Sequence, residues 1–235
     1  MSRPAGLYPG SVANLPDHLM PLPDGREQLS RETLAEHQRA RILDAAVGVF
    51  AKRGYRATTI DHLVAASKSS VGGFYAIFSG KEDCFLALYD GIVGEAEERI
   101  AAACAEADDW ADRALLGLHA MLEIFSAEPL KVRIVLVEIQ TVGPPGRRCY
   151  DATIDAVVEW LRAGRGRYPA AAELPSSFEA AAVGGVAWYL QQSLESSAHA
   201  STEELFDDIA NLLLEAIVGD KELARRRRAL AGISA

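Results

Sequence analysis

The sequence has no apolar run of transmembrane length and no recognisable signal for export. A membrane-spanning helix needs about 18 consecutive apolar residues, and no part of the 235-residue chain contains such a run. The beginning of the chain also lacks the basic-then-apolar pattern of a secretion signal. These absences predict a cytoplasmic protein without a membrane partner.

Cysteine and histidine are too few and too dispersed to suggest a metal or nucleophile site. Cys84, Cys104 and Cys149 are odd in number and lack a zinc-ligand spacing. We expect reduced thiols in or near the core, with a redox-sensing pair as the alternative. None of the five histidines pairs with cysteine or aspartate at a known spacing, and no phosphate-binding loop occurs. The sequence therefore predicts neither catalysis nor a cofactor.

A net charge of −9 argues against a nucleic-acid-binding protein until it is divided along the chain. Residues 37–90 carry seven Lys or Arg against five acidic residues, whereas residues 91–235 carry fourteen against twenty-three. Hydrophobic residues make up 49% of the chain, enough for a substantial core. The division suits a small DNA-binding unit on an acidic body that repels phosphate.

The segment from residue 58 to residue 83 has the pattern of a helix-turn-helix followed by a third helix. Thr58 or Thr59 can cap a first short helix, and Ser70 can cap a second one. Ser79-x-x-Glu82 has the spacing of a capping box that starts the third helix. A helix, a tight turn and a short second helix place backbone and small side chains in a DNA major groove.

An ordered set of short motifs runs from about His37 to Asp90. The motifs are Phe50-x-x-x-Gly54-Tyr55, Thr58-Thr59, Phe74-Tyr75-x-x-Phe78 and Lys81-Glu82-Asp83. Each is weak alone, but together and in this order they resemble the TetR family of bacterial transcriptional regulators. The resemblance implies an all-α homodimer that binds a roughly palindromic double-stranded DNA operator and leaves it when a small molecule binds the body.

The resemblance also implies which residues contact DNA. Thr59 and Tyr75 would bind phosphates, and Lys81 would add a positive charge at a helix N-terminus. Arg39 and Arg41 would reach the flanking backbone. The residues that would face base edges are Ser70, Val71, Gly72 and Gly73, with Val71 against a thymine methyl. The alternatives are a core-facing Tyr75 and an Arg39 that is only a solvated charge.

The turn departs from the family pattern at Ser67-Lys68-Ser69-Ser70, where Ala-Gly-Val-Ser is usual. Either Lys68 adopts the left-handed conformation at a cost of roughly 1 kcal/mol, or the turn has another shape. Ser69 replaces an apolar anchor. In return, Lys68 would be placed to contact a phosphate.

Beyond residue 80 the sequence predicts only helices. The expected spans are 80–106, 110–126, 131–140 and 148–163, followed by helices that start at the capping boxes Ser176-x-x-Glu179 and Ser201-x-x-Glu204. Residues 131–140 are rich in β-branched side chains, but their apolar positions follow helical spacing. Gly143-Pro144-Pro145-Gly146 is expected to separate two helices.

The last two predicted helices resemble the pair through which TetR-family subunits dimerise. Gly184 and Gly185 lie in the middle of the first one, where each costs about 1 kcal/mol relative to alanine. Close approach of another helix would offset that cost. The second helix presents Leu205, Ile209 and Leu212. These five residues are the predicted dimer interface, and an intramolecular bundle core is the alternative.

The resemblance further implies an effector pocket in the body. The candidate lining residues are Trp110, His119, Met121, Phe125, Glu138, Trp160 and Trp188. Ordinary core packing is the alternative for each of them. Glu138 lies in an apolar run and is either buried with a hydrogen-bonding partner or on an exposed face.

The predicted fold class is all-α, with four parts along the chain. They are a largely disordered N-terminal arm (1–29), a three-helix DNA-binding head (30–80), a helical ligand-binding and dimerisation body (81–219) and a basic tail (220–235). Ser30 is expected to cap the first helix, with Leu29 and Leu34 as a hydrophobic staple. The run Arg225–Arg228 in the tail is either solvated or a second contact for DNA or another acidic surface.

The predicted function is a ligand-responsive homodimeric repressor. Two alternatives remain at this point. One is a TetR-like regulator without a small-molecule effector, switched by a protein partner or by its cysteines. The other is a helical carrier or enzyme in which the DNA-binding head is vestigial.

Overall fold

The computed structural model describes residues 31–195 and 201–231, and every regular element within these ranges is a helix. The α-helices are α1 (Arg31–Arg53), α2 (Ile60–Ser67), α3 (Val71–Tyr75), α4 (Lys81–Cys104), α5 (Trp110–Ala127), α6 (Pro129–Leu136), α7 (Pro144–Arg165), α8 (Phe178–Glu195), α9 (Thr202–Ala210), α10 (Ala216–Val218) and α11 (Asp220–Ala231). Short 3-10 segments are η3 (Glu138–Thr141) and η4 (Pro169–Ala171), and η5 (Asn211–Glu215) is a π-helical turn between α9 and α10. The predicted all-α fold is confirmed.

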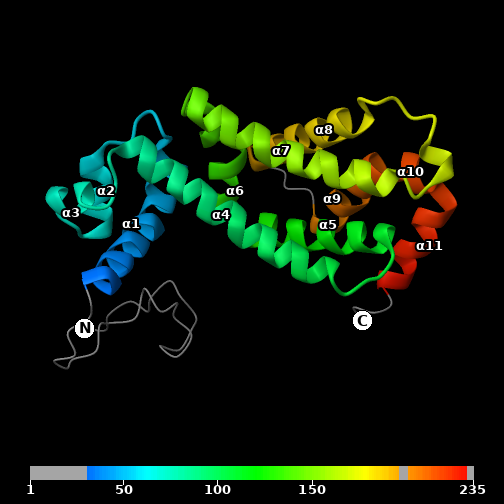
Figure 1. Cartoon of the computed structure of the whole chain (residues 1–235), viewed down its shortest axis with the longest axis horizontal. Helices are drawn as coiled ribbons and strands as arrows, with labels where there is room; N and C mark the ends of the chain where they lie inside the picture. The colour runs from blue at the N-terminus through cyan, green and yellow to red at the C-terminus, as the bar shows by residue number, and fades with distance from the viewer. Residues whose placement is uncertain (1–30, 196–200, 232–235) are drawn as a thin grey trace.

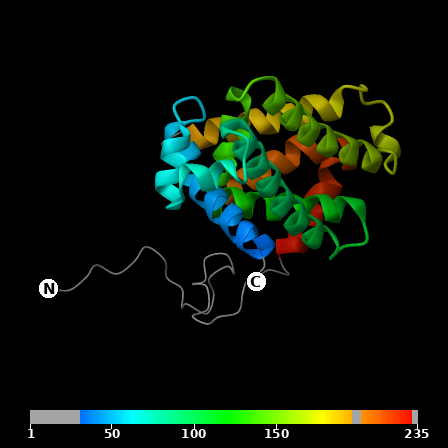
Figure 2. The same cartoon turned by 60° about the vertical axis from the view of Figure 1, so that its left-hand side comes forward.

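Helices α1–α3 form a head at one end of the molecule, and the later helices form a body (Figure 1). Helix α4 runs from the head along the body. The turned view shows the head as a lobe on one side of the bundled body helices (Figure 2). None of the described helices is both long and apolar enough to cross a bilayer.

Two apolar clusters hold the protein together, and they do not divide at residue 80. The head core joins α1–α3 to the first half of α4, to α6 and to η3, and it includes Phe50, Phe74, Phe85, Ile134 and Ile139. The body core joins α5, the second half of α7, α8, α9 and α11, and it includes Leu115, Leu161, Val186, Ile209 and Leu223. Residues 129–142 thus complete the core of the head although the sequence places them in the body.

Several predicted caps are confirmed because they depend only on neighbouring residues. Thr59 caps α2 by accepting a hydrogen bond from the His62 backbone N–H at 3.3 Å, and Nδ1 of the His62 ring accepts one from the Thr59 N–H at 3.2 Å. Ser201 and Glu204 form the expected capping box of α9. Local side-chain chemistry therefore sets where these helices begin.

Two predicted capping boxes are wrong in their partner. The backbone N–H and the hydroxyl of Ser79 both donate to Asp83, not to Glu82, although α4 does begin at Lys81. Glu179 is fully buried and pairs with Arg165 of α7 at 3.2 Å. In both cases another partner takes the place of the predicted one, and sequence spacing alone does not reveal which partner wins.

Residues 129–165 differ from the expected spans at their glycine and prolines. The segment at 131–140 is helical as predicted, but α6 ends at Leu136 and η3 follows. Gly143 provides the expected break with φ of 101°. Helix α7 nevertheless begins at Pro144 and not near Arg148, because a proline in the first turn of a helix leaves no N–H without a partner.

The predicted basic tail is instead a helix, α11, that packs on the body. Leu223 is buried in the body core, so residues 220–231 belong to the body. Figure 1 places α11 at the end of the body away from the head, which argues against a DNA contact by Arg225–Arg228. The arm, including Leu29 and Ser30, lies outside the described residues, and Leu34 is exposed.

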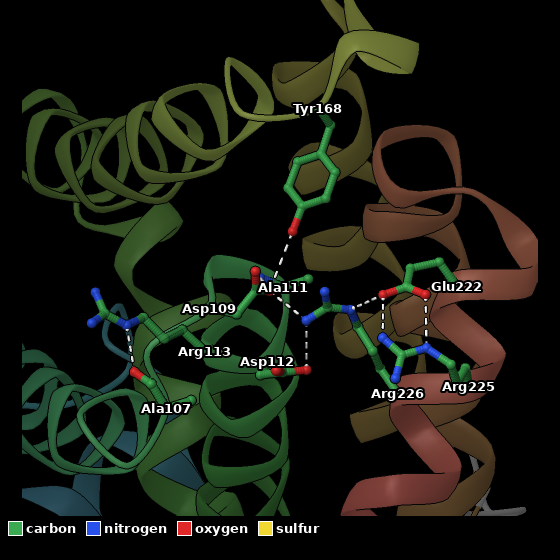
Figure 3. A network of polar contacts seen from close by, with 9 residues as sticks. All are labelled: Ala107, Asp109, Ala111, Asp112, Arg113, Tyr168, Glu222, Arg225 and Arg226. Carbon is green, nitrogen blue, oxygen red and sulfur yellow. Dashed lines mark hydrogen bonds and ion pairs between the residues drawn. The ribbon is translucent and has the colours of Figure 1, made fainter.

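Arg226 holds α11 against the first turn of α5 (Figure 3). Its guanidinium pairs with Asp109, with Asp112 at 2.8 Å and with Glu222 at 2.7 Å. The Tyr168 hydroxyl donates to Asp109 from the far side at 3.3 Å. Partial burial acts to raise the pKa of Asp109, but the Ala111 N–H and Arg226 outweigh it, so the pKa is lowered. The network joins three segments that are distant in sequence.

Candidate DNA-binding surface and effector body

The turn between α2 and α3 forms with Lys68 in the left-handed conformation. Its φ is 53° and its ψ is 34°, and the N–H groups of Lys68 and Ser69 both donate to the Val64 carbonyl. The hydroxyls of Ser67 and Ser69 lie 2.8 Å apart and bond to each other. Of the two predicted alternatives, a left-handed Lys68 is therefore the one observed. Serine hydroxyls and backbone bonds replace the glycine and the apolar anchor of the usual pattern.

Arg39 and Arg41 are engaged within the head. Arg41 donates from Nη2 to the Ser67 carbonyl at 2.9 Å and to the Lys68 carbonyl at 3.4 Å, so it satisfies carbonyls at the end of α2. The Arg39 guanidinium lies over the Phe78 ring, 5.7 Å from its centroid. Neither geometry tests the predicted backbone contacts, but Arg41 has a structural role that the sequence did not suggest.

Helix α3 presents an exposed edge of small and partly apolar side chains. Ser70 caps it by accepting from the Gly73 N–H at 3.0 Å. Val71 is 47% exposed and Tyr75 is 54% exposed, whereas Phe74 points into the head core. The alternative of a core-facing Tyr75 is therefore wrong. The edge has the size and chemistry to enter a major groove.

The two glycines of α3 differ in their surroundings. A Cβ added to Gly72 would meet no atom within 4 Å in the described chain. At Gly73 it would lie 2.4 Å from Nε2 of Gln38, a flexible side chain of α1. Packing against Gln38 within the head thus favours glycine at position 73, whereas Gly72 faces open space on the exposed edge.

Lys81 bonds within the head, at the corner between α1 and α2. Its Nζ donates to the Tyr55 carbonyl at 2.8 Å and to the Thr58 carbonyl at 2.9 Å. It also lies 4.3 Å from the centroid of the Tyr55 ring. Partial burial lowers its pKa. Two of its N–H donors are used internally, so the observed role of Lys81 is to fix this corner, and a phosphate contact stays a prediction.

Residues 42–88 match the family model described as "Bacterial regulatory proteins, tetR family". The match covers the helix-turn-helix just described and the start of α4. Over these residues the chain matches the TetR family of bacterial regulatory proteins. Regulators of this family bind operator DNA and small-molecule effectors.

Solved structures with the same fold cover about three quarters of the chain. The fatty acid degradation regulator FadR from Bacillus halodurans is 19% identical, with a TM-score of 0.62 over 75% of this chain and 94% of that one. FadR from Bacillus subtilis in complex with stearoyl-CoA is 15% identical, with a TM-score of 0.60 over 77% and 98%. AibR in complex with isovaleryl coenzyme A and operator DNA is 17% identical, with a TM-score of 0.58 over 75% and 97%. No curated protein matches the sequence.

The predicted pocket residues do not gather around one point. Trp110 is buried in the body core against Trp160 and Tyr168, with ring centroids 5.4 and 5.7 Å away. Met121 and Phe125 pack on the same core, while His119 is exposed beside Glu123. Trp188 is 62% exposed on α8 and lies outside this core.

Glu138 lies apart from these side chains. It is buried at the junction of η3 with the head, where its Oε2 accepts from the Tyr55 N–H at 2.8 Å. The predicted need for a hydrogen-bonding partner is met by the head and not by a ligand. Sequence spacing could not show this, because the two residues are 83 positions apart.

The predicted dimer residues fall on two different faces. Leu205 and Ile209 are buried in the body core of the same chain, so the intramolecular alternative holds for them. Leu212 is exposed, and Gly184 has no atom of the described ranges within 4 Å of an added Cβ. A Cβ added to Gly185 would lie 3.6 Å from Cδ2 of Leu212, which is an ordinary contact distance. The exposed face of α8 and η5 thus carries Gly184, Trp188 and Leu212.

Proposed function

We propose that the chain is a homodimeric transcriptional repressor that binds a palindromic operator through α3 and is released from it by a small molecule bound in the body. The observation that carries the proposal is the exposed edge of α3, held by a capped helix-turn-helix. Ser70, Val71, Gly72 and Tyr75 are all exposed there, and the residues behind them are buried. Enzymatic activity is not part of the proposal, since the solved relatives are regulators.

Selection from a random pool of DNA duplexes tests the proposal. At about 150 mM salt, where nonspecific electrostatic binding is weakened, the full chain should enrich a palindrome. The two half-sites should lie one helical turn or a multiple of it apart. A folded protein that enriches no sequence would overturn the proposal.

A pair of matched variants locates the DNA surface. Gly72→Glu adds a bulky negative charge at an open position of α3, and affinity for the selected duplex should fall about a hundredfold or more through steric exclusion and phosphate repulsion. Gly91→Glu makes the same change at an exposed, open position of α4 and should leave affinity unchanged. Equal affinities of the two variants would contradict the assignment of α3.

The outer face of α8 and η5 supports the dimer. Trp188 and Leu212 are large apolar side chains exposed on adjacent segments, and Gly184 leaves room for a close neighbour. Exposed tryptophans near the centre of an apolar patch dominate many interfaces. A second copy of the chain, related by a two-fold axis, would bury this face against itself.

Replacing Trp188 by glutamate should raise the dissociation constant of the dimer at least tenfold, because each subunit would bring a charge into an apolar interface. Analytical ultracentrifugation across a concentration series measures this constant. Val157→Glu is the control, since Val157 is an exposed apolar residue on α7, and it should leave the constant unchanged. A Trp188→Glu protein as dimeric as the wild type would place the interface elsewhere.

We propose an acyl-CoA thioester as the effector class. The support is that structures of the same fold hold stearoyl-CoA and isovaleryl coenzyme A. The selected duplex serves as the probe, and its release on addition of acyl-CoA is the readout. A thiol switch is less well supported, because burial raises the pKa of the Cys84 thiol to about 12 and keeps it protonated.

A further inference from the structure

The corner between α1 and α2 is held by two opposite charges from outside the head helices. Glu138 of η3 accepts from the Tyr55 N–H at 2.8 Å, and Lys81 of α4 donates to the Tyr55 carbonyl at 2.8 Å. Gly54 makes the approach of Glu138 possible, because its φ is 79° and an added Cβ would lie 3.3 Å from Oε2. The Tyr55 N–H therefore donates to one of these charged groups, and the Tyr55 carbonyl accepts from the other.

The burial of Glu138 indicates that its bond to Tyr55 helps to fix the position of the corner. The Glu138 side chain is 6% exposed, whereas that of Arg133, its ionic partner at 3.4 Å, is 36% exposed. A buried carboxylate is costly unless its partners are well placed. The partner that crosses to the head is a single backbone N–H, so the position of the corner depends on where η3 holds the carboxylate.

Helix α6 connects η3, the segment that carries Glu138, to the body. Gln191 of α8 donates from Nε2 to the Leu136 carbonyl, the last residue of α6, at 2.7 Å. Leu136 is followed by Val137 and Glu138, so a shift of α8 would be carried over two residues to the carboxylate. These bonds do not involve α4, the helix that joins head and body covalently, although Lys131 of α6 pairs with Glu95 of α4 at 2.6 Å.

We propose that Glu138 is a head-positioning residue in a polar route that runs from Gln191 through the end of α6 to Tyr55. A change in the body that moves α8 relative to α6 would alter the hold on the α1–α2 corner and so the orientation of α3. The route deepens the proposed function, because it supplies a second way for the body to act on DNA binding. Its own test needs neither operator nor effector.

Amide hydrogen exchange of the full chain measures the hold on the corner. Glu138→Gln keeps the shape of the side chain but weakens the bond to the Tyr55 N–H, so exchange in residues 54–60 should quicken about tenfold. Glu123→Gln is the control, an exposed carboxylate on α5. Exchange in α5 should remain unchanged in both variants, which separates local release of the corner from general loss of stability.

The decisive variant does not touch the head. Gln191→Leu removes the bond to α6, and exchange in residues 54–60 should quicken about threefold, whereas Gln192→Leu at the next, exposed position should have no effect. A Glu138→Gln protein with wild-type exchange at the corner would overturn the proposal. So would a Gln191→Leu protein that changes only α6 and α8. Loss of DNA selection by the wild type would instead bear on the proposed function and leave this result intact.

Discussion

Replacing Arg165 by methionine is expected to lower the free energy of unfolding by about 3–5 kcal/mol. Arg165 lies in the last turn of α7, and its Nη1 is 3.2 Å from Oε1 of Glu179, which has no exposed surface. The same guanidinium donates to the carbonyls of Ala171 and Pro175 at 2.9 and 3.1 Å, and also to that of Leu174. Without it, the Glu179 carboxylate would be buried without a cation, and the α7–α8 connection would lose its carbonyl partners.

Urea unfolding at one fixed protein concentration measures the loss for Arg165→Met. The matched design adds Glu179→Met alone and both changes together. The double variant should recover part of the loss, because a buried pair costs more when one partner is removed than when both are replaced by apolar groups. The second oxygen of Glu179 already lacks a hydrogen-bond partner within the described chain, so the carboxylate depends heavily on Arg165. Additive effects of the two single changes would contradict this coupling.

Gly164→Ala should destabilise the protein by about 3 kcal/mol, although alanine is the better helix former by about 1 kcal/mol. A Cβ at this position of α7 would lie 1.7 Å from Cε2 of Trp110. Trp110 cannot retreat easily, because it is buried between the rings of Trp160 and Tyr168. The ring would have to leave its place in the body core.

Gly94→Ala serves as the control for Gly164→Ala, and a second change at Trp110 serves as the rescue. Gly94→Ala lies inside α4 where an added Cβ meets nothing within 4 Å among the described residues, and it should stabilise by about 0.5–1 kcal/mol. Trp110→Leu combined with Gly164→Ala should recover part of the loss, since the smaller side chain vacates the clash. Thermal unfolding together with tryptophan fluorescence would follow both effects. A Gly164→Ala protein as stable as the wild type would mean that the contact with Trp110 is not as close as described.

The sequence was most informative where structure depends on neighbouring residues. Ser70 and Ser201 are the caps that the sequence predicts, and Thr59 is one of its two candidates for α2, because a hydroxyl reaches an N–H only two or three residues away. Lys68 could be singled out because a lysine stood where a left-handed residue was required. Even the start of α4 at Lys81 was placed, although Asp83 and not Glu82 bonds to Ser79.

Predictions were wrong where the surroundings of a side chain depend on residues that are distant in sequence. Leu205, Ile209 and Leu212 share one apolar segment, and nothing local shows that the first two face the body core while the third faces outward. Arg226 belongs to a basic run that looks solvated until Asp109 and Asp112 are brought beside it. Trp188 could be placed only once the outer face of α8 was known.

The shared core of the head has a consequence for how such regulators can be recombined. A hybrid that joins the first 80 residues of this chain to the body of another would leave Ile134, Ile139 and Val142 behind. The DNA-binding head of the hybrid would then expose apolar side chains that these residues normally bury. The Tyr55 N–H would also lose its hydrogen-bond acceptor, Glu138. Exchange of DNA specificity would have to carry residues 129–142 and the first half of α4 as well, so the inherited unit is discontinuous in the gene although it is continuous in space.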